Sequence, residues 1–333
     1  MVTRVALRQR CGAQSRRRLS TAAAARRSLS ATAAPAPAER VDVVVAGGGV
    51  VGLSTAYHAA EHSSVLLLEQ GALGGGTTWH AAGLVRQARG SKSDTLRTGV
   101  YARRLYRELE ELTGLSTGFT KTGNVGLARS ADRLVEMRRA ASRLRGCGVA
   151  VEEISVDEAA AKLAGIVAPD AYTGAFWTPG DGQVDPSNVA AALAKGARMR
   201  GAEIRERQGV HTVLPEEDGG WRVVLEDGAE IVARCVVNAA GQWARKLGQR
   251  SGVEVPLHSN EHFYVVTRPV EGMTVPSDLP TFRDPDGCFY GRGWSGGLSR
   301  RRDCHFTDTP FLSLLKHLLK VRGVPSNDSL ADG

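Results

Sequence analysis

Three glycines near the start of the chain have the spacing of a dinucleotide-binding turn. Gly47, Gly49 and Gly52 follow an apolar, mostly β-branched run and precede an apolar pattern of helical period. Such a turn offers backbone N–H groups and the positive end of a helix to the phosphates of a dinucleotide. Gly47 permits the tight turn, Gly49 lets the backbone approach a pyrophosphate, and Gly52 lets helix and strand pack closely. The motif predicts a dinucleotide site; the alternative is a purely structural βαβ unit.

A carboxylate stands where the ribose of that dinucleotide is expected. Glu69 ends a second apolar run, residues 65–68, about twenty residues past the turn. There it would accept hydrogen bonds from ribose hydroxyls and would repel a 2′-phosphate. The sequence therefore disfavours NADP.

A loop of mostly small residues follows this second predicted strand. Between Gly71 and Leu84, one indole, Trp79, and one imidazole, His80, stand among glycine, alanine and threonine. Small residues let the backbone pass close to a flat, bulky group, and the carboxyl edge of an open α/β sheet is where ligands bind. From the residues alone, His80 has two readings, a hydrogen-bonding loop histidine or a general base.

The segment Thr77-Thr78-Trp79-His80-Ala81-Ala82-Gly83-Leu84 resembles the flavin-attachment segment of sarcosine and dimethylglycine dehydrogenases. The same family carries a near-identical G-D-G-x-x-D-P segment, here residues 180–186. The resemblance implies FAD as the cofactor, with His80 matching the histidine that bonds to the isoalloxazine ring. The further positions that it assigns to the cofactor are Thr77, Thr78, Gly83, Leu84, Val210, Ala240 and Gly241.

The resemblance also assigns a substrate pocket. His262 and Tyr264, in an alternating strand, are implied to face it as the catalytic pair, because the carboxylate and amine of an amino acid need donors and acceptors there. Arg283 has two readings, neutralising a carboxylate or forming a surface salt bridge.

The order of predicted elements indicates an α/β two-domain flavoprotein. We expect a Rossmann-like FAD-binding part at about residues 41–115 and 186–250, and a mixed-sheet substrate part at about 116–185 and 251–298. Residues 221–233 predict a hairpin, and residues 235–238 a separate strand before a helix. A chain of 333 residues has room for both domains.

The resemblance is expected to end near Leu298. After it, residues 299–304 replace a glycine-rich strand that closes the flavin domain in the family, and residues 311–321 are a short helix candidate. The tail of residues 299–333 fits a truncated gene product or a divergent protein. We prefer truncation, so the fold is expected to be C-terminally incomplete.

The formal charge of +8 comes from the first 40 residues. They hold nine arginines, no lysine and one acidic residue, and the rest of the chain carries 34 basic and 34 acidic residues. An Arg- and Ser-rich, acid-poor leader is typical of a transit peptide and favours the mitochondrial matrix; a basic tail is the alternative. The neutral body argues against a nucleic-acid partner.

The sequence predicts neither a membrane-spanning protein nor one stabilised by disulfides or zinc. No run of eighteen apolar residues is present, so the sequence predicts no membrane span. Five cysteines without C-x-x-C spacing predict neither a disulfide framework nor a zinc site.

The expected function is oxidation of the C–N bond of an N-methylated amino acid, of sarcosine or dimethylglycine type, by hydride transfer to FAD. An electron-acceptor flavoprotein is the partner that the resemblance implies.

The alternative function is that of the regulatory subunit of pyruvate dehydrogenase phosphatase, a member of the same family that works by protein binding. Residues 238–244, 261–264 and 293–297 resemble it, but it lacks the attachment histidine. A third reading is an NAD-linked dehydrogenase.

Overall fold

The structure is a computed structural model that describes residues 39–87, 93–217, 219–260, 264–267, 274–294 and 297–302. Nearly all of the predicted leader, the helix candidate at 311–321 and the predicted catalytic residue His262 lie outside the described residues. The following description concerns the compact unit that begins at Glu39.

The helices of this unit are of ordinary length, apart from the 21-residue α2. They are α1 (Val50–Ala59), α2 (Ser93–Thr113), α3 (Ala131–Gly146), α4 (Val156–Lys162), α5 (Pro186–Met199) and α6 (Ala244–Arg250), with short 3-10 turns η1 (Pro169–Ala171) and η2 (Gly241–Trp243).

The strands of the described residues form three sheets. They are β1 (Glu39–Ala46), β2 (Val65–Glu69), β3 (Leu84–Val85), β4 (Asn124–Ala128), β5 (Glu152–Ile154), β6 (Gly174–Thr178), β7 (Gly182–Gln183), β8 (Glu203–Glu206), β9 (Val210–Pro215), β10 (Trp221–Leu225), β11 (Glu230–Asn238), β12 (Tyr264–Val266), β13 (Thr281–Asp284), β14 (Phe289–Trp294) and β15 (Gly297–Arg302).

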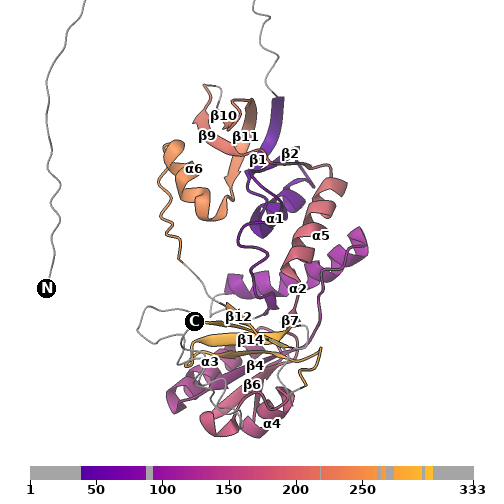
Figure 1. The fold of residues 1–333 in the computed structure, drawn as a ribbon, viewed down its shortest axis with the longest axis vertical. Coiled ribbons are helices and arrows are strands. Elements are labelled where there is room, and N and C mark those ends of the chain that lie inside the picture. Colours follow the sequence, from indigo (N-terminus) through magenta and orange to yellow (C-terminus); the bar gives the residue numbers. More distant parts are fainter. Residues whose placement is uncertain are drawn as a thin grey trace, which may run out of the picture. The chain divides into compact units, whose positions relative to one another are not determined.

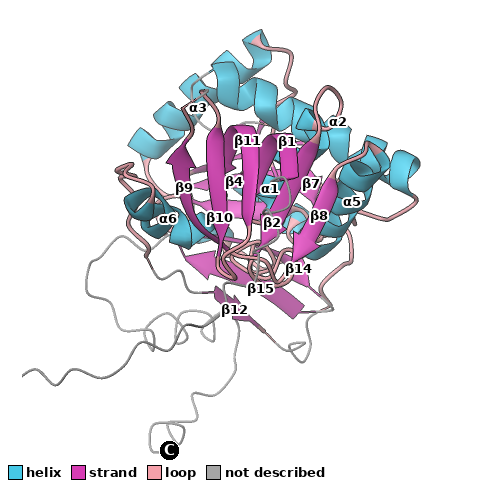
Figure 2. Ribbon diagram, turned by 90° about the horizontal axis from the view of Figure 1, so that it is seen from above, coloured by secondary structure: helices cyan, strands magenta, loops and turns pink. Residues whose placement is uncertain are grey.

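The first sheet has the strand order β8-β2-β1-β11-β10-β9, which Figure 2 shows from above. The four strands from β8 to β11 are parallel, and β10 and β9 complete an antiparallel meander. Val45 and Leu67 pack under α1 and α5, whereas Val44 and Leu66 pack on the opposite face. Burial on both faces explains why the second half of β1 and the first four residues of β2 are continuous apolar runs instead of alternating ones.

Strand β11 corrects one sequence expectation. Residues 229–233 and 235–238 were predicted as the second half of a hairpin and a separate strand, but Glu230–Asn238 is one continuous strand. Its first half pairs with β10 and nearly its full length pairs with β1. No glycine, proline or other turn former interrupts this stretch, so both neighbours pair with a single strand.

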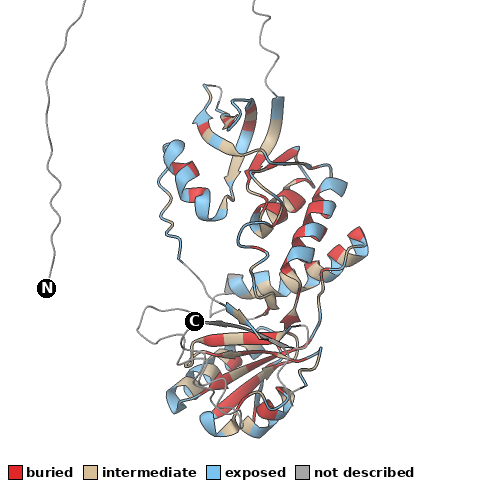
Figure 3. Ribbon diagram, viewed as in Figure 1, coloured by how far each residue is buried: buried red, intermediate tan, exposed pale blue. Residues whose placement is uncertain are grey.

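The second sheet is mixed and has the order β12-β15-β14-β13-β4-β6-β5. Among its described strands, only β13 and β4 pair in parallel. Figure 1 shows α3 and α4 beside this sheet, and Figure 3 shows the buried residues concentrated in its strands. A small sheet of β3 and β7 joins Leu84 to Gln183 and Val85 to Gly182.

Strand β15 changes the expectation for the residues after Leu298. Residues 299–302, expected to replace a strand, themselves belong to β15, which pairs antiparallel with β14 and β12. Backbone groups make these ladder hydrogen bonds, so a run of arginines does not prevent strand formation.

The observed architecture confirms the expected α/β class, with a Rossmann-like first sheet and a mixed second sheet. The predicted start of α5 is also observed, because the Asp185 carboxylate accepts from the N–H groups of Ser187 and Asn188. In the part of the chain that the structure describes, every helix is too short or too polar to cross a membrane.

Candidate cofactor and substrate site

The glycine turn joins β1 to α1 and depends on two of its glycines for packing. Gly47 has φ of +115°, and a Cβ there would lie 2.4 Å from the Ala239 carbonyl oxygen. A Cβ at Gly52 would lie 1.8 Å from the Gly47 carbonyl oxygen. Gly52 therefore allows the helix to pack on the turn itself, a tighter contact than the helix–strand packing expected from the motif.

The third glycine lies at the open end of α1. Gly49 is the N-cap and has no side chain to accept a capping hydrogen bond, and the first turn of the helix has no acidic residue. A Cβ at Gly49 would meet only the Thr78 hydroxyl oxygen, at 3.3 Å. The backbone N–H groups and positive dipole of this helix end are therefore approachable by an anion.

Thr78 connects the small-residue loop to this helix end. Its hydroxyl oxygen accepts a hydrogen bond from the Val50 N–H at 3.0 Å, and the residue is 9% exposed. The adjacent Thr77 is exposed. The loop after β2 is thus held against the first turn of α1.

Glu69 is bound to the same turn. One carboxylate oxygen accepts from the Gly48 N–H at 2.6 Å, and the other accepts from the Gly71 N–H at 2.7 Å. Each oxygen keeps a second lone pair. Glu69 can therefore brace the turn and still accept hydrogen bonds from ribose hydroxyls.

The other residues assigned to the cofactor lie along the same sheet edge. The Gln208 N–H donates to the Glu69 carbonyl at 2.9 Å, so the chain crosses the end of β2 just before Val210 begins β9. Ala240 follows β11, and its Cα would lie 3.0 Å from a Cβ at Gly47. Gly241, with φ of +54°, opens η2.

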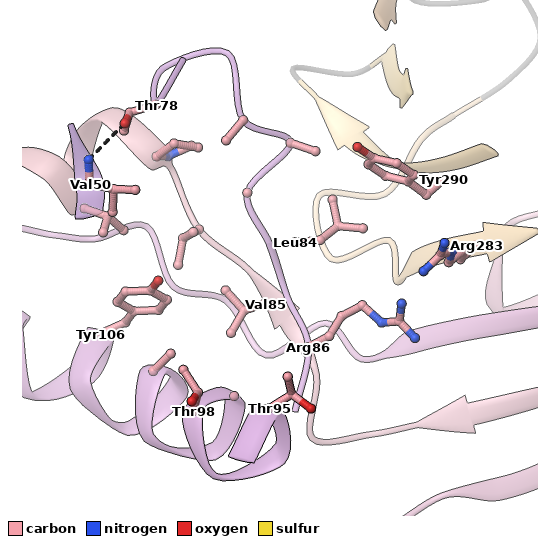
Figure 4. Close-up of a pocket in the computed structure, with 18 residues that line it drawn as sticks. Val50, Thr78, Leu84, Val85, Arg86, Thr95, Thr98, Tyr106, Arg283 and Tyr290 are labelled. Atoms are coloured by element: carbon pink, nitrogen blue, oxygen red, sulfur yellow. Dashed lines mark hydrogen bonds between the residues drawn. The ribbon is translucent and has the colours of Figure 1, made fainter. Parts of the chain in front are cut away.

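A pocket of about 720 Å³ opens beside the loop. Its wall comes from the start of α1, the loop through Arg86, the first half of α2, the start of α5, and strands β13 and β14 (Figure 4). Of the predicted cofactor residues, Thr78, Gly83 and Leu84 line it. Most of the lining is small or apolar, which suits a flat ring and restricts water.

His80 and Tyr264 meet outside this lining. The Tyr264 hydroxyl lies 3.5 Å from His80 Nδ1, and the His80 ring lies against Trp79 with ring centroids 3.6 Å apart. The structure thus brings the predicted attachment residue together with a predicted substrate residue from β12. Arg283, left open between two roles, lies on the pocket wall and is half-buried.

Sequence reasoning missed a buried polar contact behind the pocket. Asp181 is 1% exposed, and its carboxylate accepts from the Gln87 N–H at 2.9 Å. Burial raises the pKa of Asp181, while the Gln87 hydrogen bonds and the nearby charges of Arg86 and Arg103 act in the opposite direction. From the sequence, Asp181 entered only as part of the G-D-G-x-x-D-P resemblance at residues 180–186, and nothing local to that segment points to Gln87.

Comparison with known proteins identifies the family of this chain. The model of the family described as "FAD dependent oxidoreductase" matches residues 42–313. The chain belongs to this family. The match extends past Leu298, where the resemblance was expected to end. Membership implies FAD as the cofactor. The α1 terminus with its glycine N-cap and approachable backbone fits the pyrophosphate of FAD, and the Glu69 carboxylate fits its ribose.

Three relatives illustrate the range of the family. The chain is 38% identical over 270 residues to the mitochondrial pyruvate dehydrogenase phosphatase regulatory subunit of Mus musculus, which covers 80% of this chain and 30% of that protein. It is 38% identical over 264 residues to the mitochondrial sarcosine dehydrogenase of Homo sapiens, covering 78% and 28%. The crystal structure of glycine oxidase from Geobacillus kaustophilus matches with a TM-score of 0.68 and 28% identity, covering 84% of this chain and 78% of that one. The chain thus spans less than a third of the two curated relatives' length.

Proposed function

We propose that this chain is the FAD-binding and substrate-binding part of an enzyme that oxidises the C–N bond of an N-methylated amino acid of sarcosine or dimethylglycine type. The observation that carries the proposal is the Thr78–Val50 hydrogen bond. It holds the His80-bearing loop against the phosphate-binding end of α1, and the same loop continues as the wall of a pocket large enough for a flavin ring and a small substrate.

Different residues of the chain bind different parts of FAD and of the substrate. The start of α1 takes the pyrophosphate, Glu69 takes the ribose hydroxyls, and the backbones of Val210 and Ala240–Gly241 flank the adenine and pyrophosphate. Thr77, Thr78, Gly83 and Leu84 border the ring. We assign covalent attachment to His80, the substrate amine and carboxylate to His262 and Tyr264, and exclusion of water to the apolar lining.

FAD supplies the redox chemistry. When bound, FAD would accept a hydride from a C–H bond beside the substrate nitrogen; the nitrogen lone pair would form the C=N bond, and water would then release an aldehyde and the shortened amine. A substrate amine that binds neutral has its lone pair available, so the protein need not remove a proton first. We assign the electrons' onward transfer to a separate acceptor flavoprotein, and the Arg-rich leader supports a location in the mitochondrial matrix.

A visible spectrum of the purified full chain tests the proposal. The expected result is a flavin band that is bleached anaerobically by sarcosine or dimethylglycine. A protein that stays colourless after expression with added riboflavin and incubation with FAD contradicts it. A flavin band that no N-methylated amino acid bleaches contradicts the substrate assignment.

The second candidate is a non-catalytic regulator, favoured by the 38% identity to the phosphatase regulatory subunit. It predicts that the chain binds a pyruvate dehydrogenase phosphatase catalytic subunit and oxidises no amine. Gel filtration of the two proteins together, beside the bleaching assay, separates the candidates. Fold does not separate them, because one scaffold can carry either function.

A further inference from the structure

An exposed indole lies against the imidazole of His80. Trp79 is 52% exposed, although tryptophan side chains are on average highly buried. Its ring and the His80 ring have centroids 3.6 Å apart and planes tilted by 33°. Side chains of neighbouring residues in an extended chain point to opposite sides, so this contact depends on the turns of residues 73–80. The loop after β2 is thus folded so that the two rings meet.

Two hydrogen bonds hold Trp79 within its own loop. Its backbone N–H donates to the Gly74 carbonyl at 3.3 Å, and its indole Nε1 donates to the Gly75 carbonyl at 3.2 Å. The Gly74 N–H donates in turn to the Gly48 carbonyl at 2.9 Å, within the glycine turn between β1 and α1. The indole is therefore tied to the turn that fits the pyrophosphate.

The orientation of the His80 ring depends mainly on this indole. The Tyr264 hydroxyl lies 3.5 Å from His80 Nδ1, but the two ring centroids are 6.1 Å apart. Rotation about the bond that joins a histidine ring to its Cβ has broad minima, so the ring needs a neighbour to fix its plane. Among the described residues, Trp79 makes the closest ring contact with His80.

We propose that Trp79 is a positioning residue for flavin attachment: its indole face sets the plane of the His80 ring and stabilises positive charge on that ring as the bond forms. The inference rests on the proposed function, which assigns the attachment to His80. A nitrogen lone pair lies in the plane of the imidazole, so this plane decides whether the lone pair points at the carbon that it attacks. A positive charge over an indole face is attracted by the quadrupole of the indole.

The attachment step exchanges two bonds to hydrogen for one C–N bond. When bound, FAD offers a methyl carbon of its isoalloxazine ring as the partner of the imidazole. A C–H bond of that carbon and the N–H bond of the imidazole break, and a nitrogen lone pair forms the C–N bond. The two electrons pass through the flavin to dioxygen, which takes up the two protons and becomes hydrogen peroxide. Trp79 gives and takes neither protons nor electrons, so its effect is on orientation and charge alone.

The test follows attachment in time. The full chain without flavin is mixed with FAD in air, and the attached share is the flavin fluorescence that stays with the protein after acid precipitation. Trp79→Leu removes the aromatic face, and Trp79→Phe restores a face without the bond to Gly75. The matched control is Trp221→Leu, because Trp221 is 39% exposed and pairs with Ala233, beside Val41 and away from the glycine turn.

The attachment rate is expected to fall on the order of tenfold or more in Trp79→Leu and to return to within about threefold of wild type in Trp79→Phe. Trp221→Leu is expected to match wild type. Because Trp79 is half exposed, all variants are expected to melt like wild type. Total bound flavin after gel filtration, attached or not, is expected to be the same in all four proteins.

A spectroscopic measurement on the flavin-free protein accompanies the kinetics. The ring current of a stacked indole shifts the imidazole C–H proton resonances of His80 upfield, and comparison with His80→Ala identifies these resonances. The upfield shift is expected in wild type and Trp221→Leu, is expected to be smaller in Trp79→Phe, and is expected to be absent in Trp79→Leu. This measurement needs neither bound flavin nor turnover.

Several outcomes overturn the inference. These are an unchanged attachment rate in Trp79→Leu, equal slowing in Trp79→Leu and Trp79→Phe, or loss of total bound flavin in a Trp79 variant that melts like wild type. Equal slowing would place the effect in the bond to Gly75, and loss of total flavin would mean that the indole binds the cofactor. A wild type that binds FAD without attaching it also overturns the inference, whereas bleaching by an N-methylated amino acid would still support the oxidation. A wild type whose attachment depends on the Trp79 face but that oxidises no amine would instead contradict the proposed oxidation and support the inference.

Discussion

The Thr78 hydroxyl accepts the Val50 N–H at 3.0 Å and so ties a loop residue to the first turn of α1. These residues are 28 positions apart and belong to different elements, and both line the pocket. Val50 lies at the helix end that fits a pyrophosphate, while Thr78 begins the loop that lines the pocket. One hydrogen bond therefore couples the two ends of the cofactor site.

Removing that hydroxyl is expected to weaken both stability and flavin retention. Thr78→Val leaves the Val50 N–H without its acceptor at a nearly buried position, which costs about 1 kcal/mol of unfolding free energy. Urea unfolding measures this loss, and the flavin-to-protein ratio after gel filtration measures retention. Thr55→Val is the matched control, because the Thr55 hydroxyl donates only to the Val51 carbonyl within α1. Equal effects of the two substitutions would contradict the coupling.

Two glycines of the turn are expected to fail in different ways when replaced by alanine. Gly52→Ala places a Cβ 1.8 Å from the Gly47 carbonyl oxygen, so we expect a loss of about 3 kcal/mol or more, or no folded protein. Gly49→Ala meets only a hydroxyl at 3.3 Å and should keep the fold within about 1 kcal/mol. Its methyl group would nevertheless obstruct a pyrophosphate, so bound flavin should fall.

Thermal melting and flavin absorbance separate these outcomes. Gly49→Ala should melt near the wild-type temperature and be pale, whereas Gly52→Ala should show a lowered or absent transition. A Gly49→Ala protein with full flavin content would contradict the assignment of this helix end to the pyrophosphate.

The glycine turn and Glu69 were predictable because their signal is local. Strand, turn, helix, second strand and acid follow within about 25 residues, and this spacing predicts that Glu69 lies at the turn. The hydrogen bond that it accepts from the Gly48 N–H was not among the expectations. The α5 cap at Asp185 was also predictable, because the capping carboxylate and the N–H groups that donate to it are neighbours in sequence.

The contact behind the pocket was not predictable from one sequence. Gln87 and Asp181 are 94 positions apart and meet because β3 pairs with β7, two strands of two residues each. Strands this short leave almost no periodicity to recognise. Arg283 was found as a cation, but its role depended on which face of β13 it occupies, which only the burial of Phe282 and Asp284 decides.

Asp181 is expected to make stability depend on pH. Burial raises its pKa above the ordinary value of 3.8, so the folded state holds its proton more tightly than the unfolded state. The resulting stabilisation is fully present below pH 3.8 and is lost as pH rises through the raised folded-state pKa. Asp181→Asn removes this titration and retains an oxygen that can accept from the Gln87 N–H.

Urea unfolding at acidic to neutral pH measures whether Asp181 stabilises or destabilises the fold as pH rises. The unfolding free energy of Asp181→Asn minus that of wild type should increase as pH rises from about 3 toward neutrality. Asp132→Asn, at the exposed start of α3, controls for the loss of one carboxylate. A difference that decreases with pH would mean that the charges of Arg86 and Arg103 outweigh burial.

Substitutions of His80 and Tyr264 are expected to have different effects, the first on flavin attachment and the second on amine oxidation. Their side chains meet at 3.5 Å, yet the proposal gives the imidazole to the flavin and the phenol to the substrate. After acid precipitation, flavin fluorescence should remain with the protein in wild type and in Tyr264→Phe, but it should be lost from His80→Ala. The control His211→Ala, at an exposed residue of β9, should behave like wild type. Tyr264→Phe should slow amine oxidation by roughly tenfold or more, as expected for loss of one polar group that acts on the substrate. Protein-bound fluorescence that survives in His80→Ala would assign the attachment to another residue, and full turnover in Tyr264→Phe would remove the phenol from the substrate site.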